Sequence, residues 1–184
     1  MISVKNLSFS YGDKVIFSDF SVEMCGKITI LHGPSGCGKT TLTRIIAGLE
    51  TNYSGTVSAD FEKIGYMFQE DRLLPWLTAE ENVAAVMEKA DINKARRALD
   101  MMELKELYSA YPKNMSGGQQ RRVAIARLIA YEPDLMILDE PFKGLDNELQ
   151  KRIAEKIKGL NIPIVAALHS GDEMRLLGGE IIEL

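Results

Sequence analysis

The chain has 184 residues, of which 46% are hydrophobic and 26% charged, a balance that fits one globular domain and excludes wholesale disorder. The formal net charge is −4, which argues against nucleic acid as a partner, because nucleic-acid-binding domains carry a basic face. The N-terminus lacks the layout of a secretory signal and no apolar run approaches the roughly 18 residues that cross a bilayer, so we expect a cytoplasmic chain with two reduced cysteines.

The N-terminal stretch alternates between apolar and polar residues. Ile2 and Val4 precede the turn Tyr11-Gly12-Asp13, and Val15 and Phe17 follow it. This period of two predicts antiparallel strands around a turn. Later apolar runs are continuous instead, which is typical of parallel strands buried on both faces. These runs are 28–31, 135–138 and 164–168, and residues 64–68 are a further predicted strand.

Helical spacing separates these runs. Leu149, Ile153, Ile157 and Leu160 recur at three- and four-residue steps, and the segment after Gly117-Gly118 has a similar stripe. Residues 78–108 are helical in pattern, with no strand signal. We therefore expect one domain of the α/β class, with a parallel-sheet core and antiparallel subdomain at about 1–74 and 133–184 and a helical insertion at about 75–132.

The octet that starts at Gly33 matches the phosphate-loop pattern G-x-x-x-x-G-K-[ST], between a predicted strand and a predicted helix. Backbone N–H groups of such a loop bind phosphates, Lys39 is expected to reach the β- and γ-phosphates, and Thr40 to bind Mg²⁺. An ordinary glycine-rich turn is the alternative. The predicted phosphate-binding residues are Gly33, Pro34, Ser35, Gly36, Cys37, Gly38, Lys39, Thr40 and Thr41.

The apolar run at 135–138 ends in two acids, Asp139 and Glu140. Ligands bind at the carboxyl ends of strands in α/β sheets. Asp139 is therefore a candidate Mg²⁺-linked carboxylate and Glu140 a candidate general base for an attacking water. The alternative is a pair of solvated loop acids.

The segment Met115-Ser116-Gly117-Gly118-Gln119-Gln120 resembles the LSGGQ signature of the ATP-binding-cassette (ABC) ATPase family, with Met in place of Leu. Ser116 is a good N-cap, and the glycines leave N–H groups free at the start of the next helix, which makes a second anion site. The resemblance implies a P-loop NTPase fold of ABC type and a head-to-tail homodimer. Each ATP would lie between one phosphate loop and Ser116, Gly117, Gly118 and Gln119 of the other copy.

Other family positions also match. The resemblance implies that Tyr11 lies under the adenine ring, that Gln69 of the Q-loop touches Mg²⁺ or water, and that His169 is the switch histidine at the γ-phosphate. It also implies that the D-loop, Gly144-Leu145-Asp146, crosses the dimer interface. A lone Tyr or His would more often be structural. The catalytic set is thus Lys39, Gln69, Glu140 and His169, and the Mg²⁺ set is Thr40, Gln69 and Asp139. The chain departs from the pattern at Lys143 and Ser170.

The segment from Phe68 to Val83 looks like the Q-loop region of nitrate, sulfonate, taurine and thiamine-precursor importer ATPases. This implies the motor of an importer, peripheral on the cytoplasmic face of the membrane through a separate permease that contacts the region Gln69–Leu77. The transported solute is not encoded here. The alternatives are a DNA-repair or translation-associated ABC ATPase, which would need a coiled-coil insertion or a second cassette, and a small-molecule kinase, which has no use for the signature.

One apolar segment, Leu73-Leu74-Pro75-Trp76-Leu77, follows Gln69 directly. Thr78 is a possible cap for the next helix, with acids in its first turn. Trp76 would either pack against the helical insertion or remain exposed. Because exposed apolar clusters mark interaction sites, we expect part of this segment to stay exposed and to take up a permease loop.

Overall fold

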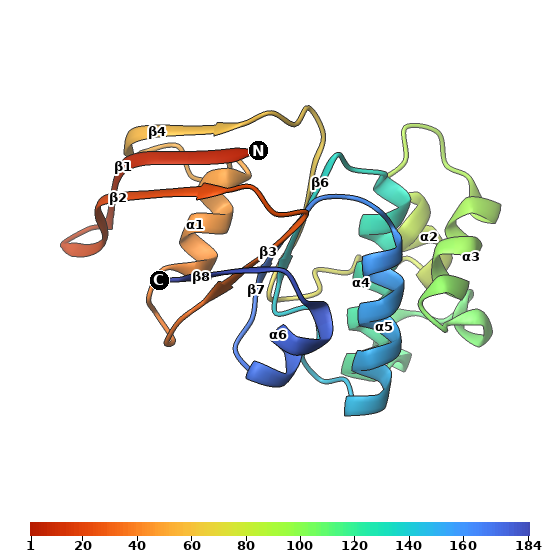
Figure 1. The fold of residues 1–184 in the computed structure, drawn as a ribbon. Coiled ribbons are helices and arrows are strands. Elements are labelled where there is room, and N and C mark those ends of the chain that lie inside the picture. Colours follow the sequence, from red (N-terminus) through yellow and green to blue (C-terminus); the bar gives the residue numbers. More distant parts are fainter.

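The computed structural model describes all 184 residues and contains two sheets (Figure 1). The smaller sheet is antiparallel, in the order β2-β1-β4. Its strands are β1 (Ile2–Tyr11), β2 (Lys14–Met24) and β4 (Ser54–Ala59). The register pairs Ile2 with Met24 and Tyr11 with Lys14. The N-terminal alternation and its turn are therefore confirmed.

The larger sheet is parallel, in the order β5-β6-β7-β3-β8. Its strands are β3 (Ile28–His32), β5 (Ile64–Met67), β6 (Leu135–Asp139), β7 (Ile164–Ala167) and β8 (Glu180–Glu183). Every residue of β6 and β7 is buried, as the continuous apolar runs predict. Neither β4 nor β8 has such a run, and sequence analysis did not find them.

Helices cover both faces of the parallel sheet. They are α1 (Lys39–Ile46), α2 (Ala79–Ala84), α3 (Ile92–Met101), α4 (Gly117–Tyr131), α5 (Asn147–Gly159) and α6 (Gly171–Leu177), with the 3₁₀ turns η1 (Lys105–Leu107) and η2 (Pro112–Asn114). The predicted stripes are buried, with Ile153 and Ile157 on α5 and Val123 and Ala126 on α4. None of the helices combines the length and the apolar character that a membrane-spanning helix needs.

Alternate residues of each central strand feed two separate cores. Leu135 and Ile137 of β6 face α1 and the antiparallel sheet, whereas Met136 and Leu138 face the cluster of α2 to α5. Figure 1 shows α1 between the two sheets and α4 and α5 on the opposite side. Because both faces are covered, the buried central strands β6 and β7 meet solvent only at their ends, where the acidic motif lies.

An ionic cluster joins the connection after α3 to α5. The Glu103 carboxylate accepts hydrogen bonds from Arg152, at 3.1 Å, and from Lys156, at 2.8 Å. Together these bonds lower the pKa of Glu103 to about 2. We call these side chains the Glu103 cluster. It links the helical part of the chain to the sheet-covering helix.

Candidate functional site

The phosphate loop connects β3 to α1, and its backbone requires glycine. Gly38 is the N-cap of α1, with φ +112° and no side-chain cap. A Cβ atom on Gly38 would lie 2.6 Å from a ring carbon of Phe17 on β2. A side chain is therefore excluded by both sterics and conformation. The first N–H groups of α1 are left pointing out of the helix, which favours an anion there.

Lys39 and Thr40 begin α1, and their side chains have different partners. The Lys39 Nζ donates to the carbonyl oxygens of Gly33 and Pro34, at 2.7 and 3.1 Å, so the ammonium lies within the loop. The Thr40 hydroxyl donates to an Asp139 carboxylate oxygen at 2.9 Å. Burial raises the pKa of Asp139, and the Thr40 hydrogen bond opposes this rise.

These two groups fit Mg²⁺ bound to a nucleotide. A hydroxyl and one carboxylate lie within hydrogen-bonding distance beside the phosphate loop, so one cation could touch both. Mg²⁺ at such sites takes few protein oxygens and completes its shell with phosphates and water.

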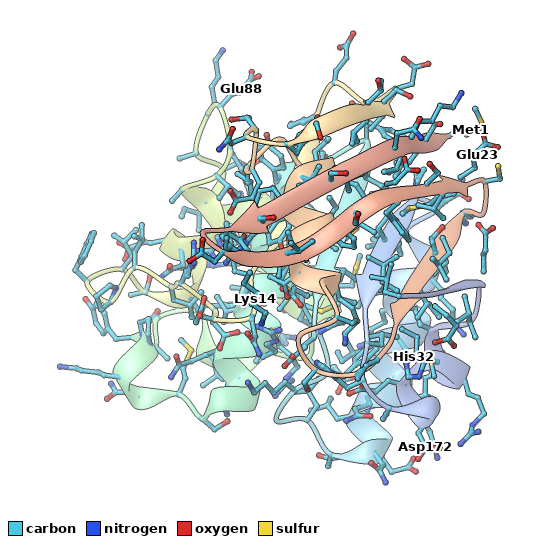
Figure 2. All side chains as sticks on the ribbon, turned by 90° about the vertical axis from the view of Figure 1, so that its left-hand side faces the viewer. Met1, Lys14, Glu23, His32, Glu88 and Asp172 are labelled. Atoms are coloured by element: carbon cyan, nitrogen blue, oxygen red, sulfur yellow. The ribbon has the colours of Figure 1, made fainter.

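One cavity of about 340 Å³ gathers most of the predicted site. Its lining comprises Tyr11, Lys14, Ile16, Ser35, Gly36, Gly38, Lys39, Thr40, Thr41, Gln69, Glu140 and His169. Lys14 and Ile16 come from β2 and were not predicted. Lys14 lies at the end of β1 and β2 where the hairpin turns, and Met1 and Glu23 lie at the other end of these strands (Figure 2). The turn Gly12-Asp13 could have predicted the position of Lys14, because a two-residue turn pairs the residues that flank it, here Tyr11 and Lys14.

Glu140 is the centre of the polar contacts in this cavity. Its carboxylate accepts a hydrogen bond from the Gln69 amide at 3.0 Å, and the same oxygen lies 2.6 Å from the His169 Nε2. The Lys143 ammonium lies 3.7 Å from its other oxygen. Burial acts to raise the pKa of Glu140, but the hydrogen bonds from His169 and Gln69 outweigh it and hold the pKa below its ordinary value.

The sheet order explains this convergence. Gln69 follows β5, Glu140 follows β6, and His169 follows β7, and these strands are consecutive neighbours. The phosphate loop follows β3, which lies next to β7. Adjacent parallel strands are about 4.8 Å apart, so their carboxyl ends bring short side chains into hydrogen-bond range.

The signature residues lie in a different place from the phosphate loop. Ser116 caps α4 in a reciprocal capping box with Gln119, and neither residue lines the cavity that contains Lys39. Gly117 instead lines a polar pocket with Gln69 and Lys143. A Cβ atom on Gly118 would lie 2.8 Å from the carbonyl oxygen of Gly144, so the signature and the D-loop are in close backbone contact.

Two structural roles were not predicted from the sequence. Asp146 of the D-loop caps α5 by accepting a hydrogen bond from the Leu149 N–H at 3.0 Å. Arg121, on α4, is almost fully buried against the carbonyl oxygens of Asp139 and Glu140. The pattern Gln-Gln-Arg-Arg gives no sign of which arginine turns inward.

The family is decided by comparison with known proteins. A family model described as ABC transporter matches residues 18–143. The chain belongs to the ABC transporter family. The resemblance drawn from the signature is thus confirmed.

Within this family, the chain is similar to ATP-binding proteins that are named for the import of aliphatic sulfonates. The aliphatic sulfonates import ATP-binding protein SsuB of Bacillus subtilis (strain 168) is 38% identical over 170 residues, 85% of this chain and 67% of the relative. The aliphatic sulfonates import ATP-binding protein SsuB 2 of Burkholderia cenocepacia (strain HI2424) is 37% identical over 188 residues, 95% of this chain and 70% of the relative.

Solved structures of ABC transporter cassettes have the same fold. The dimeric structure of MJ0796, a bacterial ABC transporter cassette, superposes with a TM-score of 0.91 at 31% identity and covers 100% of this chain and 94% of that one. A post-hydrolysis state of MJ0796 bound to ADP and Pi gives a TM-score of 0.89 at 30% identity, with the same coverage. The predicted P-loop NTPase fold of ABC type is confirmed.

Proposed function

We propose that this chain is the ATP-hydrolysing subunit of an ABC importer, working as a homodimer beneath a separate permease on the cytoplasmic face of the membrane. The observation that carries the proposal is the convergence of Gln69 and His169 on one Glu140 carboxylate oxygen, at the rim of the cavity that Lys39 lines. The import function in the names of the relatives supports the direction of transport.

The phosphate loop binds the nucleotide in this proposal. The free N–H groups at the start of α1 and the Lys39 ammonium face the β- and γ-phosphates. Lys39 exchanges its bonds to the loop carbonyls for bonds to phosphate, which keeps its charge paired throughout. Tyr11, at the hairpin end of β1, also lines the cavity and is 43% exposed, so its ring is available for stacking on the adenine.

Thr40 and Asp139, with Gln69 nearby, would hold Mg²⁺. When bound, Mg²⁺ neutralises charge that develops on the phosphate oxygens. Asp139 is 2% exposed, so bulk water cannot screen its charge, and the raised pKa reflects the cost of keeping it ionised without a cation.

Glu140 accepts the proton of the attacking water. Its hydrogen bonds to Gln69 and His169 fix the carboxylate in the cavity, and its lowered pKa keeps it ionised at neutral pH. His169 is positioned to exchange this bond for one to the γ-phosphate. The partner copy supplies Ser116, Gly117, Gly118 and Gln119 to the same ATP, because none of these residues lines the cavity of its own chain that contains Lys39.

Replacing Glu140 by glutamine tests the proposed chemistry. The amide keeps the shape and the hydrogen-bonding capacity but cannot take a proton, so turnover should fall about 10²–10⁴-fold while ATP affinity is retained. An ATP-bound dimer should accumulate in size-exclusion chromatography. The control is Glu155→Gln on the exposed side of α5. Near-normal turnover of Glu140→Gln would refute the assignment of the base.

The proposed permease contact uses the segment after Gln69, in which Trp76 is 68% exposed. Asn82 of α2 is fully buried and fixes this segment: its amide oxygen accepts from the Leu74 N–H at 2.8 Å, and its amide nitrogen donates to the Leu74 and Leu77 carbonyls at 3.0 Å. The indole is therefore presented to solvent by an ordered loop, and this supports an interface role over core packing.

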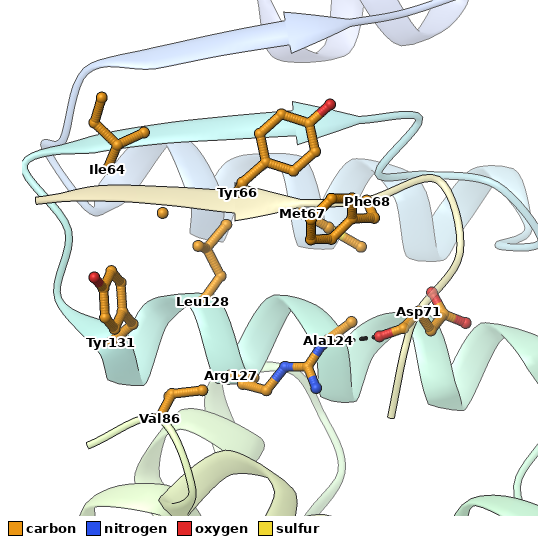
Figure 3. A pocket seen from close by; sticks show the side chains of 11 residues that line it. Ile64, Tyr66, Met67, Phe68, Asp71, Val86, Ala124, Arg127, Leu128 and Tyr131 are labelled. Carbon is orange, nitrogen blue, oxygen red and sulfur yellow. Dashed lines mark hydrogen bonds between the residues drawn. The ribbon is translucent and has the colours of Figure 1, made fainter. Parts of the chain in front are cut away.

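A groove lined in part by Asp71, at the start of this segment, offers a second part of this surface. It has a volume of about 210 Å³ and lies between the edge strand β5 and α4, with Phe68 and Asp71 at one end and Tyr131 at the other (Figure 3). Its lining is mostly hydrophobic. A groove lined mostly by hydrophobic residues, together with an exposed tryptophan five residues after Asp71 in the chain, fits a short permease helix or loop with large apolar side chains.

Trp76→Ala tests this contact. The melting temperature and ATP affinity should stay near wild type, because the side chain is mostly exposed. Co-purification with the permease and solute-stimulated ATPase should both fall, since truncating an interface tryptophan can cost about 2 kcal/mol or more. Leu49→Ala, which also truncates an exposed apolar side chain, is the matched control. Unchanged co-purification of Trp76→Ala would refute the contact.

A further inference from the structure

Arg121 is an almost completely enclosed charged side chain beside the proposed hydrolytic groups. It is 2% exposed and lies on α4, a few residues after the Ser116 cap. Its guanidinium is surrounded by oxygens from two segments far apart in sequence. The acceptors are the carbonyls of Phe68, Gln69, Asp139 and Glu140 and the carboxylate of Asp71.

These contacts close a ring with the Gln69–Glu140 pair. The Arg121 Nη1 donates to the Gln69 carbonyl at 3.1 Å, and its Nε donates to the Glu140 carbonyl at 3.2 Å. The side chains of Gln69 and Glu140 then meet each other at 3.0 Å. A single rigid fork thus sets the backbones of both residues whose side chains touch, which a flexible ammonium could not do.

The backbone of Glu140 needs such support. Its φ is +52°, in the left-handed region that non-glycine residues enter at a cost of about 1–2 kcal/mol. Its N–H donates to the Ala167 carbonyl at 3.1 Å, and its C=O accepts hydrogen bonds from Arg121 and from the Lys143 N–H, the latter at 3.3 Å. Without the guanidinium, the carbonyl would lose its only charged donor, and the peptide after Glu140 could relax towards an ordinary conformation.

We propose that Arg121 is a positioning residue for ATP hydrolysis, which holds Gln69 and Glu140 in the one arrangement that brings their side chains together. This inference rests on the proposed role of Glu140 as the base. Arg121 does not line the cavity of its own chain that contains Lys39, and its hydrogen bonds go to loop carbonyls and to the Asp71 carboxylate, so within its own chain it acts through these groups. Its position on α4 also ties this arrangement to the helix that the signature residues begin.

Arg127 provides a matched control on the same helix. Its guanidinium donates to the carbonyls of Asp71 and Arg72, both at 2.9 Å, but to no atom of Asp139 or Glu140. Arg121→Gln and Arg127→Gln therefore both remove an arginine that holds the loop after Gln69. Only Arg121→Gln also removes the hydrogen bonds to the Glu140 carbonyl.

Steady-state ATPase kinetics separate the two. In Arg121→Gln, kcat should fall about 10²-fold, the loss typical of a misplaced catalytic group, while KM for ATP stays within about twofold. Arg127→Gln should keep kcat within about threefold. Arg121→Lys, which keeps the buried charge but lacks the fork, should fold and still lose most of the same activity. If Arg121→Lys turns over at the wild-type rate, the proposal is overturned.

A double-variant cycle with Glu140→Gln provides the decisive comparison. Because Arg121 acts through Glu140, Arg121→Lys should cost less than about threefold further in the Glu140→Gln background. A further loss as large as that in the wild-type background would overturn the proposal. Failure of the proposed function is seen separately, because in that case Glu140→Gln alone keeps normal turnover.

Discussion

Asn82→Ala should destabilise the chain through the loop that carries Trp76. Asn82 is fully buried, and its amide binds the backbone of Leu74, Leu77 and Thr78. In the variant, the Thr78 carbonyl keeps the bond from the residue 82 N–H, and the Leu74 carbonyl keeps the bond from the Leu77 N–H. The Leu74 N–H and the Leu77 carbonyl lose their partners.

These two groups set the size of the effect. An unsatisfied buried polar group costs about 1–3 kcal/mol, and because both are only partly buried we expect about 2–4 kcal/mol in total. For a chain of this length, that lowers the melting temperature by about 10 °C. The same change should loosen the segment around Trp76, and co-purification with the permease should fall although no interface side chain has been altered.

Urea and thermal unfolding followed by circular dichroism measure the stability. Trp76 is the only tryptophan, so its fluorescence anisotropy reports the local mobility of the loop. Asn147→Ala, an exposed asparagine at the start of α5, is the control and should change the unfolding free energy by less than about 0.5 kcal/mol. If Asn82→Ala unfolds like this control and the anisotropy is unchanged, then Asn82 does not order the loop.

Three further outcomes are expected. Gly38→Ala should lose nucleotide binding in a filter or fluorescence assay, because the new Cβ would lie 2.6 Å from a ring carbon of Phe17 on β2. MgATP should slow alkylation of Cys37, beside the Lys39 ammonium in the phosphate loop, but not that of the exposed Cys25, as measured by mass spectrometry. The pKa of Glu103 is about 2, below its ordinary 4.5, so the Glu103 cluster stabilises the fold above about pH 4.5 and this stabilisation is lost as the pH falls towards 2. Glu103→Gln should therefore lower the unfolding free energy by up to about 1 kcal/mol at pH 7 and by much less at pH 2.5, in urea titrations.

Much of the fold was readable because its signals are local. The buried strands β3, β6 and β7 have continuous apolar runs, and α5 has a clear apolar stripe. The strands β4 and β8 were missed because Ser54–Ala59 and Glu180–Glu183 are short and mostly exposed, so no burial pattern marks them. Their pairing depends on neighbours that only the fold supplies.

The candidate site also contains residues that a local motif predicts and residues that only the fold reveals. Lys39, Thr40, Asp139 and Glu140 were found because each belongs to a motif at a strand end. Arg121 was not, because its partners lie about 20 and 50 residues away and any exposed helical arginine has the same sequence signature.

The close approach of Gly118 to the Gly144 carbonyl limits which residues position 118 can accept. A methyl group at position 118 would have to displace the backbone at position 144, which lies in the loop that leads from Glu140 to α5. Every residue type has this carbonyl oxygen, so no substitution at position 144 makes room for a side chain at position 118. A glycine outside the nucleotide cavity is thus required by the backbone of the loop that follows Glu140, and we expect position 118 to remain glycine whichever residue occupies position 144.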